Sequence, residues 1–168
     1  VVPNKGRWID QGHSVWMTQV ALVTHDIERL TDWYQSVLGF APTRKGDFSD
    51  HPRMNEVVDY DGLSLKAAWF KMDRVCKTLE LWQYRNPLTS APTGKRAVTG
   101  LGYSFSIEVE DIQLEYARLR DLGVEFLSDP VLMEGYWQVY GHDIDGNVFA
   151  LRQWVDPDSV YSLRTLET

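Results

Sequence analysis

Residues 19–40 read QVALVTHDIERLTDWYQSVLGF, and residues 104–124 read SFSIEVEDIQLEYARLRDLGV, with the same order of features. Each stretch begins with alternating apolar residues, continues through Asp-Ile and an amphipathic run, and then reaches Leu-Gly. A second pair of stretches, TLELWQY at 78–84 and VFALRQW at 148–154, repeats at an offset of 70 residues. One structural unit has therefore been duplicated, and we expect the functional site between the two copies, where equivalent positions face each other.

Each copy has the pattern of one strand, one helix and three further strands. In the first copy, residues 15–24 alternate between apolar and polar side chains, which is typical of a strand with one buried face. Asp26 can then cap the helix through its side chain, and Gly39 can end it. The other strands of this copy are predicted at 54–60, 63–71 and 77–84, with Asp61-Gly62 as the hairpin turn between the first two.

The second copy repeats this order. Its helix is predicted to follow a cap at Asp111 and to end before Gly123. The motif DIDGN is a turn signal in front of the last strand. The strands of this copy are predicted at 104–110, 124–130, 135–141 and 147–154, with the turn at 143–147.

The predicted fold class is α+β, with two tandem βαβββ modules that form a curved mixed sheet around a cleft and carry their helices on the outside. The segment between the two copies is polar and contains Pro and Gly, as a connection between modules should. The predicted parts are an N-terminal extension at 1–14, modules at 15–85 and 101–155, a connection at 86–100 and a C-terminal tail at 156–168.

The composition narrows the class of function. The 168 residues have a net charge of −7 and a pI near 5.0, which argues against binding to the phosphate backbone of nucleic acids. The apolar runs are far shorter than the roughly 20 residues that span a bilayer, and the first residues lack a signal peptide's continuous apolar segment. The single cysteine, Cys76, excludes an internal disulfide. We therefore expect a cytoplasmic protein that binds neither nucleic acid nor a membrane.

The doubled βαβββ pattern, the two Asp-Ile helix starts and the DIDGN turn together resemble the vicinal oxygen chelate superfamily. This family includes glyoxalase I, methylmalonyl-CoA epimerase, extradiol dioxygenases, and bleomycin and fosfomycin resistance proteins. The resemblance covers about residues 15–155. It implies the fold more strongly than the activity, because this fold serves many chemistries. Since such proteins often dimerise and this chain is rich in aromatic residues, we also expect a homodimer.

The resemblance implies where metal ligands would lie, namely on the first and last strand of each copy. Counted from the two Asp caps and across the 70-residue offset, these positions hold Gln19, Glu80, Ser104 and Ala150. Gln19 and Glu80 look like the Gln/Glu pair of some glyoxalases, whereas the second copy has serine and alanine. A tightly bound divalent ion needs about three or four protein ligands. We therefore expect no metal cofactor, or only weak divalent-ion binding at Gln19 and Glu80.

Glu80 is the first candidate for chemistry. By strand alternation it shares a face with Trp82 and Tyr84. A carboxylate beside aromatic rings and without a metal suits the transfer of a proton from carbon or to oxygen. The alternative is a structural role, in which Glu80 bonds to Gln19 or pairs with a nearby arginine. His142, just before the DIDGN turn, is the second acid/base candidate, and Gln19 could hold a developing oxyanion.

Aromatic side chains dominate the face that the alternation assigns to Glu80. Such a face suits a flat or apolar ligand better than a small phosphorylated metabolite. Glu108 is expected to pair with Arg152, its neighbour in the second copy, more readily than to take part in chemistry. The predicted ligand-contacting residues are Trp82, Tyr84, Ser104, Glu108, Tyr140, Ala150, Arg152 and Trp154.

Two classes of function remain open. The first is a metal-independent isomerase or lyase that shifts a proton next to a carbonyl of a hydrophobic or aromatic small molecule, with Glu80 as the base. The second is a non-catalytic protein that sequesters a flat apolar or cationic ligand, as the antibiotic-resistance branch of the family implies. We favour the enzyme, because burying the carboxylate of Glu80 beside aromatic rings is costly if the rings only stack on a ligand. A cationic ligand would explain the presence of this carboxylate equally well.

Overall fold

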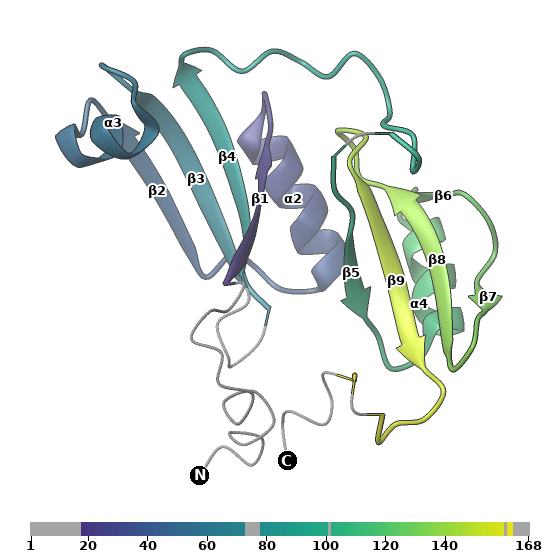
Figure 1. The fold of residues 1–168 in the computed structure, drawn as a ribbon. Coiled ribbons are helices and arrows are strands. Elements are labelled where there is room, and N and C mark those ends of the chain that lie inside the picture. The colour runs from purple at the N-terminus through teal and green to yellow at the C-terminus, as the bar shows by residue number, and fades with distance from the viewer. Residues whose placement is uncertain (1–17, 73–77, 101, 160, 163–168) are drawn as a thin grey trace, which may run out of the picture. The chain divides into compact units, whose positions relative to one another are not determined.

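The computed structural model describes residues 18–72, 78–100, 102–159 and 161–162 (Figure 1). The extension expected at 1–14, Cys76 and the end of the tail lie outside these ranges. The described residues divide into two compact units. The N-terminal unit lies within Met17–Lys95 and includes the turn residues Ile144–Gly146, and the C-terminal unit comprises Arg96–Asp143 and the described part of Asn147–Thr168.

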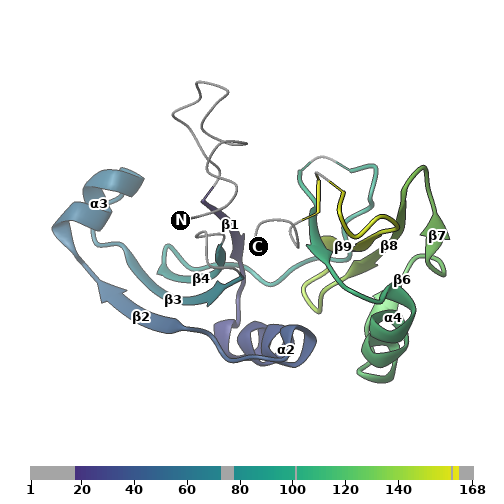
Figure 2. The same cartoon turned by 90° about the horizontal axis from the view of Figure 1, so that it is seen from below.

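The N-terminal unit is a four-stranded sheet with the order β1-β4-β3-β2. Strands β1 and β4 are parallel, and the other neighbours are antiparallel. Helix α2 packs against β3 and β4 on one face of this sheet, as Figure 2 shows. The elements are β1 (Gln19–Val23), α2 (Ile27–Leu38), β2 (Arg44–Ser49), α3 (Pro52–Val58), β3 (Ser64–Lys71) and β4 (Thr78–Asn86).

The predicted boundaries of α2 are confirmed. Asp26 accepts a hydrogen bond from the backbone N–H of Arg29 (3.1 Å), so its carboxylate satisfies one of the unpaired donors of the first turn. Gly39 has a φ of 78° and donates its N–H to the carbonyl of Gln35, which ends the helix in the left-handed conformation. The apolar face of α2 is buried against the sheet through Leu30, Tyr34 and Val37.

The strand predicted at 54–60 is wrong, because this segment forms helix α3. Pro52 fits the first turn of α3, where its missing N–H has no partner to lose. The amide of Asn55 accepts from the N–H of Leu63 (3.1 Å) and donates to Asp50 (2.8 Å), which holds the helix against the start of β3. Asp61-Gly62 therefore follows a helix and does not join two strands.

Strand β3 pairs with β4 on one side and with β2 on the other, and the sequence pattern did not reveal β2. Its sequence, RKGDFS, has charged residues and a glycine in place of a clear apolar alternation. Strand β2 lies at the edge of the sheet, where charged side chains discourage pairing with other chains. Propensity is a poor guide to such a strand, since its pairing with β3 rather than its own composition makes it extended.

The C-terminal unit repeats the plan with its own sheet, in the order β5-β9-β8-β6, and β7 pairs with β8. Strands β5 and β9 are parallel, as β1 and β4 are. Helix α4 packs against β9, and the predicted cap at Asp111 is confirmed by its bonds from the N–H groups of Gln113 and Leu114, both 3.0 Å long. The elements are β5 (Phe105–Glu108), α4 (Ile112–Asp121), β6 (Glu125–Phe126), β7 (Val131–Leu132), β8 (Tyr136–His142) and β9 (Val148–Trp154).

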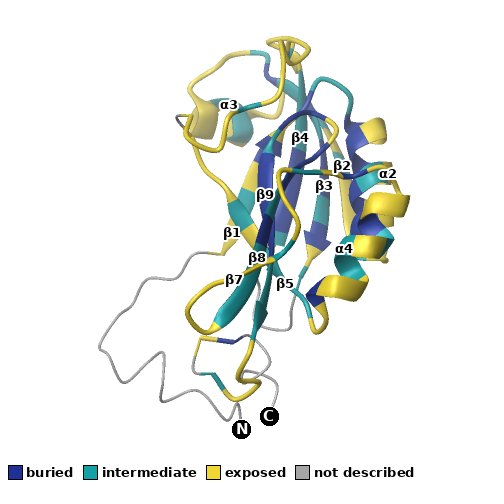
Figure 3. Ribbon diagram, turned by 90° about the vertical axis from the view of Figure 1, so that its right-hand side faces the viewer, coloured by how far each residue is buried: buried dark blue, intermediate teal, exposed yellow. Residues whose placement is uncertain are grey.

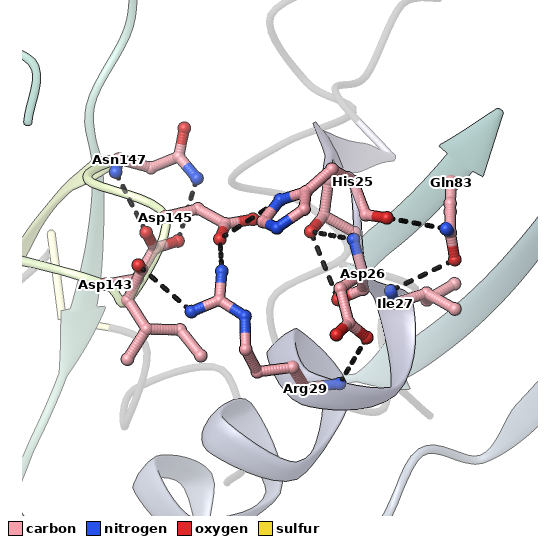
Figure 4. A network of polar contacts seen from close by, with 10 residues as sticks. His25, Asp26, Ile27, Arg29, Gln83, Asp143, Asp145 and Asn147 are labelled. Carbon is pink, nitrogen blue, oxygen red and sulfur yellow. Dashed lines mark hydrogen bonds and ion pairs between the residues drawn. The ribbon is translucent and has the colours of Figure 1, made fainter. Parts of the chain in front are cut away.

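Both units attach the start of their helix to the last strand through a glutamine. Gln83 on β4 accepts from the N–H of Ile27 (3.2 Å) and donates to the carbonyl of His25 (2.6 Å), as Figure 4 shows. Gln153, at the repeat position on β9, accepts from the N–H of Ile112 (2.9 Å). These glutamines face the helices, so the residues that alternate with them on β4 and β9 face the opposite side of each sheet.

Within each unit, the centres of the inner strands are buried and the outer sides of α2 and α4 are exposed (Figure 3). Within the part of the chain that the structure describes, no helix combines the length and the apolar character that crossing a membrane requires. The largest fully buried side chains include Tyr34, Phe70, Leu81, Phe149, Leu119 and Leu151.

Candidate functional site

Glu80 lies at the centre of a polar cluster in the N-terminal unit. The residue is buried, with only 5% of its surface exposed. Its Oε2 accepts a hydrogen bond from Nε2 of Gln19 (2.8 Å) and another from Nε1 of Trp82 (3.0 Å). Its Oε1 accepts one from Nε1 of Trp69. Donors from three neighbouring strands therefore converge on one carboxylate.

The strand register explains why these donors meet. Glu80 on β4 lies directly opposite Trp69 on β3 and Ala21 on β1, so all three point to the same face. Trp82 and Gln19 are each two residues from a member of this row, which places them on that face as well. A buried charge is strongly unfavourable unless it is hydrogen-bonded, and three N–H donors meet this need at Glu80.

The face around Glu80 is aromatic and is hereafter called the aromatic face, comprising Phe48, Trp69, Trp82 and Tyr84. These partly buried rings pack on the buried side chains of Leu65 and Ala67 in β3 and of Leu63 just before it. The ring centres of Trp82 and Tyr84 lie 6.0 Å apart, and those of Phe48 and Trp69 lie 6.4 Å apart. Burial raises the pKa of the Tyr84 phenol above its ordinary value of 10.0.

Two residues of β2 complete the aromatic face. Gly46 makes room for the rings, because a Cβ at this position would lie 2.6 Å from the ring of Phe48 and 3.1 Å from that of Trp69. Arg44 places its guanidinium 4.7 Å from the ring centre of Trp69, within the range of a cation–π contact. Neither residue was singled out from the sequence, because the sequence pattern did not reveal strand β2.

The predicted site residues of the second copy have different surroundings. Ala150 is fully buried on β9, between Ser106 on β5 and Tyr140 on β8. Ser104 is exposed and precedes β5. Glu108, on β5, accepts a hydrogen bond from the hydroxyl of Ser162.

Arg152 is the register partner of Glu108, as the predicted pairing requires, but its side chain has other contacts. Its Nη2 donates to Oε1 of Gln138 (3.0 Å), and its guanidinium lies 4.7 Å from the ring centre of Tyr136 and 5.8 Å from that of Trp154. The Arg152 side chain, which was predicted to contact a ligand, therefore lies beside two aromatic rings and the amide of Gln138.

His142 is 8% exposed on β8, and its Nε2 lies 2.7 Å from the backbone carbonyl of Arg96. Because a carbonyl oxygen only accepts, Nε2 must carry the hydrogen. This contact ties the connection between the two sheets to β8. The acid/base role of His142 stays a prediction.

A second polar cluster in the N-terminal unit was not found from the sequence. Arg29 on α2 bonds to the buried Asp145 and donates to the carbonyl of Ile144 (3.3 Å), while Nδ1 of His25 lies 4.0 Å from Asp145 (Figure 4). Asp145 belongs to the DIDGN motif, which predicted only a turn. The sequence separation of 116 between Arg29 and Asp145 explains why no local pattern could indicate this ion pair.

The residues at the four family positions do not fit a divalent ion. The carboxylate of Glu80 already accepts three N–H donors, and Gln19 presents an amide N–H to it where a ligand oxygen would be needed. Ala150 has no donor atom in its side chain. Among the described residues, no group of three or more His, Cys, Asp or Glu residues is placed to hold a metal.

The fold and this geometry can be compared with known proteins. The family model described as the Glyoxalase/Bleomycin resistance protein/Dioxygenase superfamily matches residues 16–151. No protein with a curated description matches the chain.

Solved structures resemble the chain over most of its length. A glyoxalase family protein from Bacillus cereus is 20% identical with a TM-score of 0.75, and the match covers 86% of this chain and 97% of that one. A glyoxalase/bleomycin resistance protein/dioxygenase domain from Frankia sp. EAN1pec is 15% identical with a TM-score of 0.60, covering 86% and 95%. The fosfomycin resistance protein FosX from Listeria monocytogenes is 13% identical with a TM-score of 0.53, covering 84% and 94%. At these identities the likenesses establish the fold alone.

Proposed function

We propose that this chain, which belongs to the Glyoxalase/Bleomycin resistance protein/Dioxygenase superfamily, binds a flat apolar small molecule on the aromatic face of its N-terminal sheet. The observation that supports this most directly is the hydrogen bonding of two indole N–H groups to the single carboxylate of Glu80. Indoles that are already held in place lose little rotamer freedom when a ligand stacks on them, so more of the contact energy appears as affinity.

Proton transfer next to a carbonyl is the second candidate function, and one feature of Glu80 supports it. Its Oε2 accepts two hydrogen bonds, whereas Oε1 accepts one, from Trp69. A carboxylate oxygen can accept about two, so Oε1 retains a lone pair that could take a proton from carbon. Binding ranks first because most of the acceptor capacity of Glu80 is used to hold side chains.

Neither role requires a metal in our proposal, because the donors around Glu80 are N–H groups. Treatment with EDTA should leave ligand affinity unchanged. About one tightly held Zn, Ni, Fe or Mn per chain in elemental analysis would overturn this part of the proposal.

The test of binding uses the neutral aromatic probe N-phenylnaphthylamine, with affinity measured by tryptophan quenching. In Glu80→Gln an amide NH2 replaces one oxygen and opposes an indole N–H, so at least one ring loses its anchor. We expect the dissociation constant to rise by about 2–10-fold per released indole, since ordering one side chain costs roughly 0.5–1.5 kcal/mol. Trp82→Phe, which keeps a ring but removes the N–H, should weaken binding in the same direction.

Glu108→Gln is the matched control, because Glu108 is also a hydrogen-bonded carboxylate but lies in the C-terminal unit. It should leave the affinity for the probe unchanged. If Glu80→Gln binds the probe as tightly as the wild type, or if both variants weaken binding equally, the aromatic face is not the binding site.

Proton transfer is tested separately by deuterium exchange. Phenylacetone in heavy water is followed by NMR, because exchange at the carbon next to its carbonyl needs only a base and a bound substrate. If Glu80 is a base, wild-type protein should accelerate the exchange and Glu80→Gln should lower that rate by on the order of 10²–10⁴. Exchange at the same rate in both proteins would remove Glu80 as a base.

A further inference from the structure

The C-terminal unit contains a pocket of its own, with a volume of about 460 Å³. It lies on β8 and the segment leading to β7, and its walls include Leu127, Val131, Met133 and Tyr140. This volume is within the range of small-molecule sites, and the mostly apolar wall suits a hydrophobic ligand. All of its lining residues lie within the C-terminal unit, so the pocket does not depend on Glu80.

Arg152 alone is charged among the residues that line this pocket in the described part of the chain. A single cation in a mostly apolar wall is unusual, because burying a charge without a counter-charge is unfavourable. The two rings beside the guanidinium, Tyr136 and Trp154, lie 4.7 Å and 5.8 Å from it and offset part of this penalty.

The hydrogen bonds of Arg152 are incomplete. A guanidinium has five N–H donors, and one of them, on Nη2, is used by the amide oxygen of Gln138. The buried Nε has no acceptor among the described residues. Gln138 thus holds the guanidinium beside the two rings while donor capacity is left over, which is the arrangement that a carboxylate or sulfonate completes with two parallel bonds.

We propose that this pocket binds an apolar, ring-bearing small molecule through an anionic group, with Arg152 as the anion-binding residue. The ring system of the ligand occupies the apolar wall, and its carboxylate or sulfonate oxygens accept from Arg152. Tyr136 and Gln138 act as positioning residues, because they hold the guanidinium.

The test compares two probes that share one ring system and differ in charge, anilinonaphthalene sulfonate and the neutral N-phenylnaphthylamine. Their dissociation constants are measured by fluorescence titration of the full chain at low salt. We expect the sulfonate to bind at least about tenfold more tightly than the neutral probe, as charge-assisted hydrogen bonds imply. Arg152→Met keeps the apolar stem and should abolish this preference while leaving the neutral probe's affinity within about twofold.

Gln138→Glu provides a test that does not remove the arginine. It places a carboxylate 3.0 Å from Nη2, where Gln138 Oε1 lies now, so an internal anion competes with the ligand. The preference for the sulfonate should disappear in this variant as well. Its conservative shape keeps the test decisive if Arg152→Met fails to fold.

Arg120→Met is the matched control, because the guanidinium of Arg120 also lies near an aromatic ring centre, that of Tyr116 at 5.5 Å, but on α4 and outside the pocket lining. The preference for the sulfonate should persist in it. A wild-type protein without preference, an unchanged preference in Arg152→Met or Gln138→Glu, or its loss in Arg120→Met would each overturn the proposal. The same titrations in Glu80→Gln separate this proposal from the proposed function, because that variant weakens binding on the aromatic face whereas the preference for the sulfonate should persist in it.

Discussion

Glu80 and Tyr84 are two residues apart on β4 and share the aromatic face, yet burial acts on them in different ways. Glu80 is surrounded by three N–H donors that compensate for its removal from water. Tyr84 is partly buried, and the loss of water around its phenol raises its pKa from the ordinary value of 10.0. The folded chain therefore holds the phenol proton more tightly than the unfolded chain does.

This difference predicts a loss of stability in alkali. Because the folded pKa of Tyr84 is raised, its contribution to the free energy of unfolding is complete below pH 10 and is lost as the pH rises through the folded pKa. Urea unfolding between about pH 9 and 11.5 should show a falling free energy whose slope is shallower in Tyr84→Phe. Part of the slope should remain, since burial also raises the pKa of Tyr103.

Phe48→Leu is the control for this titration, because Phe48 lies on the same aromatic face but has no ionisable group. It should leave the alkaline slope unchanged. A slope that is the same in Tyr84→Phe and in the wild type would show that the phenol of Tyr84 is not linked to folding.

At the scale of elements, the start of each helix is attached to the last strand of its own unit. The aspartate caps satisfy N–H groups beyond the first residue of the helix, and the glutamines Gln83 and Gln153 satisfy the N–H of that first residue. The same device in both copies indicates that it belongs to the duplicated unit. Its effect is to fix where the helix begins relative to the sheet.

Gln83→Met and Gln153→Met should each destabilise the protein by about 1–3 kcal/mol, because each leaves a buried helix N–H without its acceptor. Gln83→Met should have the larger effect, since Gln83 also donates to the carbonyl of His25. Gln113→Met, at an exposed position of α4, is the control and should change stability by no more than about 0.5 kcal/mol. The measurement is the free energy of unfolding in urea, and equal values for all three variants would contradict the proposed role of the glutamines.

At the scale of the whole molecule, apolar side chains remain exposed on the segment around β7. Leu127, Val131, Leu132 and Met133 are each about half exposed. Exposed apolar residues that are neighbours in the fold commonly mark a contact with another protein. We therefore propose a homodimer in which Leu132, which does not line the pocket, is covered in both copies.

Light scattering at micromolar concentration should give a mass of twice the 19.4 kDa of one chain. Leu132→Glu, which puts a charge on β7, should lower the mass to that of a single chain. Val57→Glu is the control, because Val57 is 80% exposed on α3 and should leave the mass unchanged. A mass of 19.4 kDa for the wild type would remove the homodimer from the proposal.

Features that depend on short stretches of chain could be predicted from the residues alone. The two repeats, the helices between Asp26 and Gly39 and after Asp111, and the strands that end both copies were all predicted, because periodicity and capping act over a few neighbouring residues. The same locality caused the errors at 44–60. A charged edge strand has no local pattern, and the valines before Tyr60 resembled a strand although they lie in α3.

The partners of the chemically important side chains could be identified only in the folded chain. The alternation placed Glu80 beside Trp82, but its bond to Trp69 depends on the register of β3 against β4. Likewise, Arg152 has two register partners, Glu108 on β5 and Gln138 on β8, and its side chain donates a hydrogen bond to Gln138. The physical reason is that strand alternation determines the face of a side chain, whereas its hydrogen bonds depend on which strands pair and where the neighbouring donors and acceptors then lie.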